Sequence, residues 1–444
     1  MINLFDNYTT ESRDLHIAML MSDHRQETVV INDDGYLPDD VVSPLMYFFK
    51  HAGAKFEGRP RFFNQIDLPR FWDIEANAQE GKVMDKGVQR GRITYHRTDN
   101  ERQVKTVEWF DRQGRTTVID RYNQWGWKFA ITTLDADGHY AMTTYLTPDG
   151  FEVLVENHFT GDIIYNHNHQ GDFSLFKNRT EMVKYYLEHS GLAVDRIMYN
   201  TLADGFQVTE SMAQSTHDNI LFWQEPITDS VPGNMTYLLT KAEPNTKIVV
   251  QHRSAYDRLM ELLPADQRDQ VTYLGFIYPF RRQNQQRPTT VTFTNSDQME
   301  QLEALVKTLP QVTFNVGALT EMSTKLLSFD QYDNVNLYPQ ILQTDVDRLV
   351  QEADLYLDIN HGNEILDASR TAFENNMLIA GFDQTVHNRR FTSPEHIYQP
   401  DQVEDLVHLI NTVLEDGNAL EDQLQAQWRH AGEETVAHYK QVIG

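Results

Sequence analysis

The chain has 444 residues, of which 40% are hydrophobic and 11% aromatic, so it can form two or three globular domains with a sizeable core. Its formal net charge of -27 at pH 7 opposes sequence-independent binding to nucleic acid phosphates and adsorption to an anionic lipid surface. The absence of cysteine excludes disulfides, thiolate zinc sites, iron–sulfur clusters and cysteine nucleophiles.

The first residues carry no targeting pattern. Asp6, Glu11, Arg13 and Asp14 interrupt the segment where a signal peptide would have a basic end and an unbroken apolar run. No stretch approaches the roughly 18 apolar residues of a membrane span. We therefore expect a cytoplasmic protein.

The sequence pattern of the N-terminal part changes near residue 71 and again near residue 171. Helical spacing over residues 15–21 and a β-rich run over residues 27–32 predict the first part of an α/β domain, assigned to residues 1–70. Residues 71–171 instead contain short strands about ten residues apart, separated by Asp-Gly turns, which predicts an antiparallel β-meander. The expected strands cover residues 91–96, 105–110, 116–122, 127–133, 140–146 and 152–158.

Strand and helix patterns alternate again over residues 172–280, so the meander is predicted to be inserted into the N-terminal α/β domain. The polar stretch 281–288 has linker composition. After it, a second alternating series over residues 288–412 predicts a parallel sheet with helices on both faces, and residues 413–444 form a helical tail by their spacing.

A motif near the end of this second series carries the chemistry. Residues 360–383 have the pattern of a strand end, a polar loop, a helix and a second strand, which is where an open α/β sheet presents a ligand. The segment resembles retaining glycosyltransferases with two Rossmann-like domains, whose pattern here is Glu-Gly-Phe-Gly, a second Glu after seven intervening residues, and a strand ending in Gly-Phe-Asp. Aligned from Gly381-Phe382-Asp383, the two Glu positions fall on Asn363 and Thr371, which cannot replace an ionised acceptor.

Three further segments carry a more specific resemblance: residues 1–9, Asp33 to Gly35 followed by Leu37-Pro38, and residues 358–364. Together with the domain order, they resemble the GtfB-type stabilising subunit of the bacterial protein O-GlcNAc transferase that modifies serine-rich repeat adhesins before accessory-Sec export. The resemblance spans the whole chain. It implies a GT-B architecture, that is, two Rossmann-like domains with the inserted meander.

The resemblance also implies a function. A catalytic paralogue would transfer N-acetylglucosamine from its UDP carrier to Ser or Thr. This chain would have no transferase activity and no cofactor; it would stabilise that paralogue and help hold the serine-rich repeat polypeptide. Pairing through the inserted sheets would use exposed strand edges. The family's place at the membrane periphery would be reached through the complex.

The basic side of a donor site is missing as well. Active relatives have an Arg and a Lys after the first strand of the second domain, where this chain has Asn295, Asp297 and Gln298. The turn Asn32 to Gly35 offers no Gly-rich phosphate loop either. Removing one preorganised donor typically costs roughly 3 kcal/mol in transition-state stabilisation. Because two glutamates and two basic residues are missing here, we expect no residual transfer.

Several local patterns have two interpretations. Asp33-Asp34 with Asp39-Asp40 could bind a metal but also fit a turn followed by a helix cap; His158, His167 and His169 could bind zinc but also fit a solvated turn. We expect no metal site. The hinge arginines 281, 282 and 287 are expected to lie in solvent or to pair with acids of this chain rather than with a partner. The remaining candidates for contacts to an acceptor or a sugar, with a helix cap as the alternative for the loop, are Asn360, His361, Gly362 and Glu364.

Two alternatives to a non-catalytic subunit remain from the sequence. The chain could be an active retaining glycosyltransferase that uses a UDP-sugar, with Glu364 serving in place of Asn363. It could also be a carbohydrate- or adhesin-binding module without an enzyme partner. Titration with UDP tests the first alternative, and co-purification with a catalytic paralogue tests the second.

Overall fold

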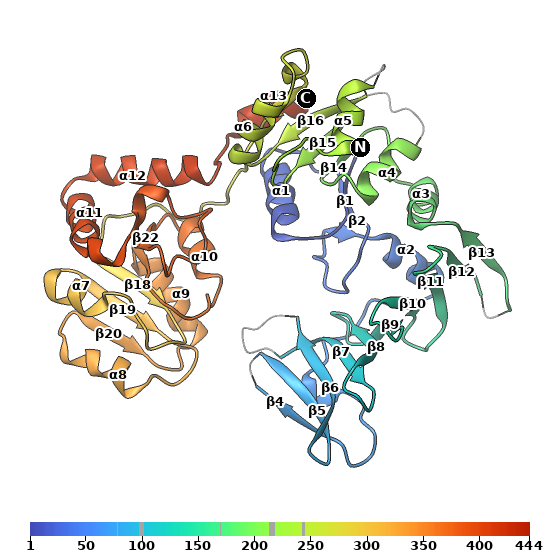
Figure 1. Cartoon of the computed structure of the whole chain (residues 1–444), viewed down its shortest axis with the longest axis horizontal. Coiled ribbons are helices and arrows are strands. Elements are labelled where there is room, and N and C mark those ends of the chain that lie inside the picture. The colour runs from blue at the N-terminus through green and yellow to red at the C-terminus, as the bar shows by residue number, and fades with distance from the viewer. Residues whose placement is uncertain (78, 97–101, 169, 213–217, 242–244) are drawn as a thin grey trace. The chain divides into compact units, whose positions relative to one another are not determined.

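The computed structural model describes residues 1–77, 79–96, 102–168, 170–212, 218–241 and 245–444. The chain forms two compact units, residues 1–274 with Ile443 and residues 275–442 with Gly444 (Figure 1). In the described residues, no helix combines the length and the apolar character that crossing a membrane requires.

Unit 1 contains a parallel sheet of seven strands in the order β17-β16-β15-β14-β1-β2-β3. Its strands read as apolar runs, as expected when both faces of a sheet are covered; all four residues of β1 are buried. The strands are β1 Ile2–Phe5, β2 Glu27–Val30, β3 Val41–Val42, β14 Ile197–Tyr199, β15 Asn219–Trp223, β16 Thr246–Val250 and β17 Val271–Tyr273. The helices are α1 Thr10–Met21, α2 Pro44–His51, α3 Arg179–His189, α4 Asp204–Ser211, α5 Gly233–Thr240 and α6 Arg253–Leu262.

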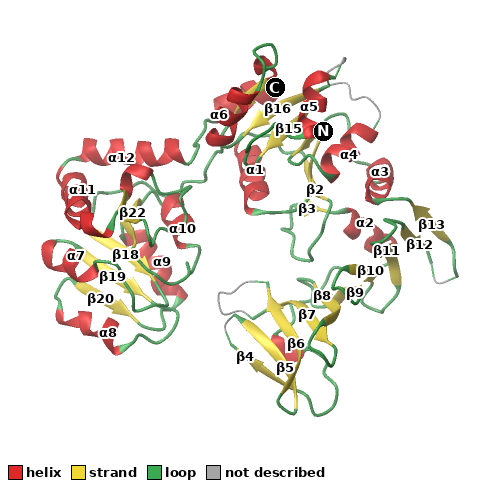
Figure 2. Ribbon diagram, viewed as in Figure 1, coloured by secondary structure: helices red, strands yellow, loops and turns green. Residues whose placement is uncertain are grey.

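An antiparallel sheet of ten strands, in chain order from β4 to β13, interrupts this unit. Its strands follow one another without an α-helix between them in the described residues (Figure 2). Gly114 and Gly138 close two of its turns at φ 81° and 85°, a conformation that favours glycine. The strands are β4 Asp73–Ala76, β5 Glu80–Asp85, β6 Val88–Tyr95, β7 Val104–Phe110, β8 Thr116–Tyr122, β9 Lys128–Leu134, β10 Tyr140–Leu146, β11 Glu152–Asn157, β12 Ile163–Asn166 and β13 Phe173–Phe176.

The expected end of this sheet at residue 171 is too early. Gly171 lies before β13, which pairs antiparallel with β12 from Ile163↔Phe176 to Asn166↔Phe173. The last strands also belong to the core of unit 1, since the ring of Phe48 on α2 lies 4.6 Å from Tyr165 and 6.2 Å from Phe176, centroid to centroid. The inserted sheet is therefore anchored to α2 through β12 and β13.

Unit 2 contains a parallel sheet of six strands in the order β20-β19-β18-β21-β22-β23. The expected boundary at residue 412 falls inside helix α11, whose Leu406, Ile410 and Val413 are buried in the core of this unit. The strands are β18 Thr289–Phe293, β19 Thr313–Gly317, β20 Val335–Tyr338, β21 Leu355–Asp358, β22 Leu378–Phe382 and β23 Ile397–Tyr398. The helices are α7 Leu302–Thr308, α8 Thr324–Leu327, α9 Gln343–Glu352, α10 Ala368–Glu374, α11 Val403–Glu415, α12 Gly417–His430 and α13 Val436–Ile443.

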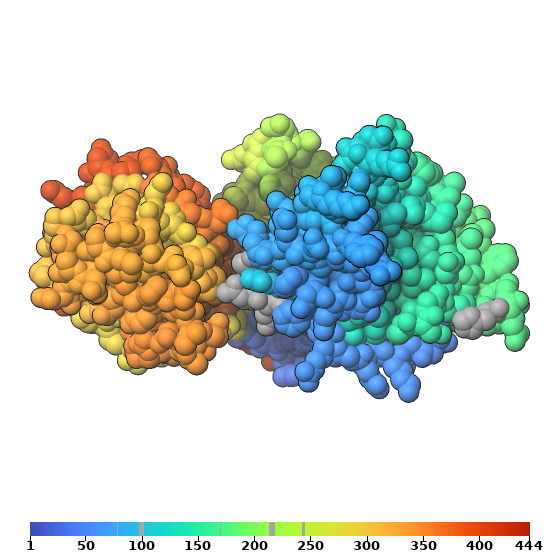
Figure 3. Space-filling view, turned by 90° about the horizontal axis from the view of Figure 1, so that it is seen from below, coloured from blue at the N-terminus to red at the C-terminus, as the bar shows by residue number. Residues whose placement is uncertain are grey.

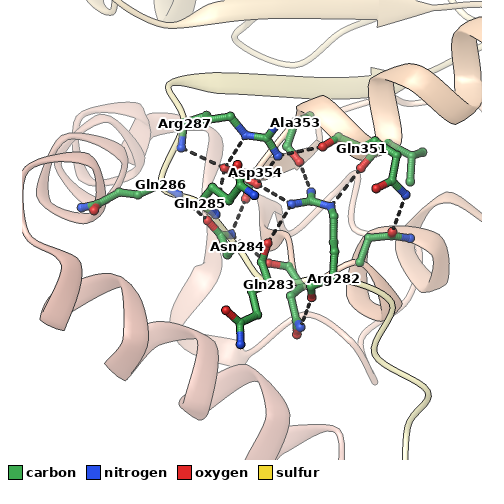
Figure 4. A network of polar contacts seen from close by, with 12 residues as sticks. Arg282, Gln283, Asn284, Gln285, Gln286, Arg287, Gln351, Ala353 and Asp354 are labelled. Carbon is green, nitrogen blue, oxygen red and sulfur yellow. Dashed lines mark hydrogen bonds and ion pairs between the residues drawn. The ribbon is translucent and has the colours of Figure 1, made fainter.

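The polar stretch 281–288 is not a linker but a folded part of unit 2 (Figure 4). Its Arg282 and Arg287 both bind the carboxylate of Asp354, at 2.5 Å and 2.9 Å, and Asp354 is 1% exposed. Burial alone would raise the pKa of Asp354, but the hydrogen bonds from the two arginines lower it. Arg281 pairs with Glu374 at 2.9 Å. The hinge arginines thus pair with acids of this chain, which confirms that expectation, while the chain divides at residues 274 and 275.

Candidate functional site

The residues predicted for a donor site meet at the carboxyl ends of two neighbouring strands of unit 2. Strands β18 and β21 pair in parallel, so the segments that follow them emerge side by side. The hydroxyl of Thr294 donates to Asn360 Oδ1 at 2.7 Å. The backbone N–H of His361 donates to the carbonyl of Gln298 at 3.0 Å. These bonds join the two loops that follow the strands.

Asn360 is 2% exposed and organises the loop that follows β21. Besides Thr294, its Oδ1 accepts the backbone N–H of Gly362 at 2.8 Å. A Cβ at Gly362 would lie only 3.0 Å from the Cβ of Ser296, so the close approach of the two loops favours glycine. Asn360 and Gly362 therefore shape the loop, whereas Asn363 and His361 are exposed on it.

A histidine that sequence reasoning missed fixes this loop from the other side. His387 Nε2 lies 2.6 Å from the carbonyl of Gly362, and its Nδ1 lies 2.6 Å from Asp358 Oδ1. The hydrogen bond with the fully buried Asp358 raises the pKa of His387 to about 9. The ring is therefore a cation at neutral pH, and both of its N–H groups donate. A titratable residue five positions after β22, at the ligand edge of the sheet, is the signal that could have found it.

The remaining acid of the motif is occupied by the helix that follows. Glu364 Oε1 accepts the backbone N–H of Ser369 at 2.8 Å, in the first turn of α10. Just before this helix, Leu366 and Asp367 have φ angles of 61° and 48°. Thr371 Oγ1 donates back to the carbonyl of Leu366 at 3.3 Å. Glu364 and Thr371 thus hold a left-handed turn in place, an arrangement that costs free energy by itself.

A pocket of about 330 Å³ lies at the carboxyl ends of β18 and β19. Two of its walls are closed by internal bonds: Asn295 Oδ1 accepts the N–H of Leu319 at 3.0 Å, and Asp297 Oδ2 accepts the hydroxyl of Ser323 at 3.0 Å. Its ten lining residues, all in the described part of the chain, include Asp297 and Glu321 but no Lys or Arg. Such a pocket repels a diphosphate. Gln298 lies on the same loop, outside this lining.

The other candidates take part in local structure. Asp33 Oδ2 accepts the hydroxyl of Ser43 at 2.6 Å, and burial raises the pKa of Asp33 to about 6. His158 bonds to Thr143 at 2.8 Å and His167 to Ser174 at 2.8 Å, and His169 lies outside the described residues. Among described residues, one group has metal-ligand spacing: Asp135, Asp137 and His139, in the turn after β9. Asp135 Oδ1 there accepts two backbone N–H groups of its own turn.

Comparisons with known proteins define the class first. A chain of the crystal structure described as "GtfA/B complex bound to UDP and GlcNAc" matches with a TM-score of 0.93 and 40% identity, covering 100% of this chain and 99% of that one. A structure of accessory secretory proteins 1, 2 and 3 from Streptococcus pneumoniae shares the fold, with a TM-score of 0.61 and 12% identity. The chain is thus a glycosyltransferase-like α/β protein.

Family models then cover most of the chain. Residues 2–48, 72–177 and 179–262 match the GtfB N-terminal, middle and third domains, and residues 290–427 match the GftB/GlyA-F C-terminal domain. The UDP-N-acetylglucosamine–peptide N-acetylglucosaminyltransferase stabilizing protein GtfB of Streptococcus gordonii is 40% identical over 444 residues, which are 100% of this chain and 98% of the relative. The protein of the same name from Streptococcus agalactiae is also 40% identical, over 100% of this chain and 99% of its own length. The chain belongs to the GtfB family of stabilising proteins, which confirms the family resemblance.

Proposed function

We propose that the chain is a non-catalytic subunit that stabilises and co-activates a catalytic paralogue of its own fold. That paralogue transfers N-acetylglucosamine from UDP-N-acetylglucosamine to Ser or Thr of a serine-rich repeat adhesin. The two parallel sheets form the Rossmann-like halves of a GT-B architecture, with the ten-stranded sheet inserted in the first half. The complex acts in the cytoplasm, at the membrane periphery, before accessory-Sec export.

The proposal rests on the residues at the carboxyl ends of β18 and β21, here called the donor edge. The positions of both motif glutamates are Asn363 and Thr371, and Thr371 bonds to the carbonyl of Leu366. The adjoining pocket presents Asp297 and Glu321 where an active enzyme needs cations for the leaving diphosphate. Glu364, which could have substituted for Asn363, accepts a hydrogen bond from Ser369 as a helix cap. The residues that remain support a folded loop rather than a transfer reaction.

The inserted sheet supplies a surface for the paralogue. In β13, Phe173 and Leu175 are 62% and 56% exposed, while Phe176, which faces the other way, is 7% exposed. Ile164 lies directly opposite Leu175 on β12 and is 37% exposed. Among the strands that the structure describes, β13 is the last of the sheet, so its outer edge is open to pairing with another chain. An apolar face beside a free edge favours protein pairing; the inserted sheet forms a continuous surface, blue to green, in Figure 3.

The loop after β21 supplies a candidate contact for the acceptor. His361 and Asn363 are exposed there, and the ring of His361 lies 2.8 Å from Glu300. Asn360, Gly362 and Glu364 hold the loop from inside. The imidazole of His361, the amide of Asn363 and the carboxylate of Glu300 can hydrogen-bond a neutral Ser/Thr-rich polypeptide, or a sugar attached to it.

Reconstitution tests the proposal. The chain is co-expressed with a catalytic paralogue, purified through a tag on one partner, and then incubated with UDP-N-acetylglucosamine and a Ser/Thr-rich peptide. We expect a stable complex and a peptide mass increased by N-acetylglucosamine, and no product from the chain alone. A product formed by the isolated chain, or a failure of the two proteins to co-purify, would refute the assignment.

A further inference from the structure

A cavity of unit 1 shares no residue with the pocket after β18. It has a volume of about 500 Å³, within the range of small-molecule sites. One wall is formed by Asn7 and by residues 31–33, which follow β1 and β2. The opposite wall is one face of the inserted sheet, and α3 contributes Arg179. The carboxyl ends of β1 and β2 are where an open parallel sheet normally presents a ligand.

Strand register explains why polar groups gather on that face. Thr143 on β10 lies directly opposite Thr132 on β9 and Glu156 on β11, so their side chains share one face of the sheet. His158 follows Glu156 by two residues and points the same way. The register therefore places a carboxylate, hydroxyls and an imidazole on one cavity wall.

The charges in this cavity are unequally paired. Glu156, which is 7% exposed, binds Arg179 at 2.5 Å, so these two groups neutralise each other. Arg121 donates to the hydroxyl of Thr132, and to that of Tyr140 at 3.4 Å. Within the described part of the chain, no carboxylate lies within ion-pair distance of Arg121. A guanidinium has five N–H donors, so Arg121 retains donors and a full positive charge for a ligand.

The cavity also has apolar lining residues, beside polar ones that include Asn7, Asn32 and Asp33. Leu154 and Ile163 line it from the sheet, and Phe129 and Met182 close it from β9 and α3. All four are buried core residues: Leu154 is 1% exposed, Ile163 2%, Phe129 1% and Met182 7%. The carboxyl of Asp33, which also lines the cavity, adds a negative charge that disfavours a ligand with two negative charges.

We propose that this cavity binds a small organic monoanion, whose single carboxylate pairs with Arg121 and whose apolar body contacts Phe129, Leu154 and Ile163. The carboxylate accepts hydrogen bonds from the guanidinium, with the hydroxyl of Tyr140 beside it. This assignment is independent of the donor edge and of the proposed function, because its residues all belong to unit 1.

Titration of the full chain with benzoate, followed by ligand-observed NMR, tests the assignment. Benzamide serves as the uncharged match, inorganic phosphate as the more highly charged anion, and N-acetylglucosamine as a neutral sugar. We expect saturable binding of benzoate and at least about tenfold weaker binding of the other three. Equal binding of benzamide or of the sugar, or no benzoate binding up to about 10 mM, would overturn the assignment.

Variants locate the site. Arg121→Gln should weaken benzoate binding at least about tenfold, Arg121→Lys should retain most of it, and Arg112→Gln, at an exposed turn, should leave it unchanged. Unaltered binding in Arg121→Gln would overturn the assignment. If that variant fails to fold, the comparison of benzoate with benzamide on the unmodified chain still decides.

Discussion

His387 and Asp358 form an ion pair beneath the loop that follows β21, with 2.6 Å between Nδ1 and Oδ1. Asp358 is fully buried at the end of β21, and the backbone N–H of His387 binds its second oxygen at 2.7 Å. The same imidazolium holds the carbonyl of Gly362. The loop is thus fixed by a charge from this chain.

This pair predicts a pH-dependent stability. The pKa of His387 is raised from 6.5 to about 9 in the folded state, so the protonated ring stabilises the fold. The contribution, about 3 kcal/mol at most, is complete below pH 6.5 and is lost as the pH rises through 9. Urea unfolding of His387→Gln should show a loss of about 2–3 kcal/mol relative to the unmodified chain at low pH, shrinking toward pH 9. A difference that stays constant across this range would contradict the assignment of the charge.

Asp354→Asn should strongly destabilise unit 2. The substitution leaves Arg282 and Arg287, both bound to this carboxylate, without a charged partner, and Asp354 is 1% exposed. We expect a loss of about 3–5 kcal/mol in urea unfolding. Asp345→Asn is the control, because Asp345 pairs with Arg348 at the surface, where an ion pair contributes about 0–1 kcal/mol. Similar losses in the two variants would show that residues 281–288 form no folded network.

Leu175→Lys should disrupt pairing with the catalytic paralogue while leaving the fold intact. Leu175 is 56% exposed on β13, so a lysine is tolerated in the isolated chain but places a charge in an apolar interface. Complex formation, measured by surface plasmon resonance, should weaken at least about tenfold. Val88→Lys, at a 50% exposed position on β6 far along the sheet, should have little effect. Equal effects would place the interface elsewhere.

His361→Ala should weaken acceptor binding by the complex without changing its assembly. The ring is exposed beside Glu300, and its removal takes away a hydrogen-bonding group from the loop. Fluorescence anisotropy with a labelled Ser/Thr-rich peptide should show a several-fold weaker affinity, on the order of 1 kcal/mol. His139→Ala, in the exposed turn after β9, is the matched control. Unchanged peptide affinity in His361→Ala would remove this loop from the acceptor site.

Much of the fold could be predicted because strand and helix periods are local. The predicted strands 116–122 and 140–146 have the bounds of β8 and β10. Strands β4, β5, β12 and β13 were missed; β4, β12 and β13 have four residues each, and a pattern with period two needs more residues to be recognised. Residues 281–288 were mistaken for a linker, since their composition does not reveal a buried Asp354 about seventy positions later.

The candidate site likewise has parts that the sequence could predict and parts that it could not. The motif spacing predicts Asn363 and Thr371 as the positions of missing acids, because that comparison needs only the sequence. A helix cap was one of the alternatives for this loop, and Glu364 forms one with α10. The sequence could not show that His387 reaches back to Gly362, since that contact depends on tertiary geometry. The cavity around Arg121 was not predicted either, because strand pairing gathers its residues from five strands.

Calorimetric titration of UDP into the isolated chain tests the central claim most directly. With no Lys or Arg lining the pocket after β18, and with Asn363 and Thr371 in place of the two glutamates, we predict only heat of dilution. The catalytic paralogue, titrated in parallel, should show saturable binding. Saturable binding of UDP to the isolated chain with a micromolar dissociation constant would contradict the account.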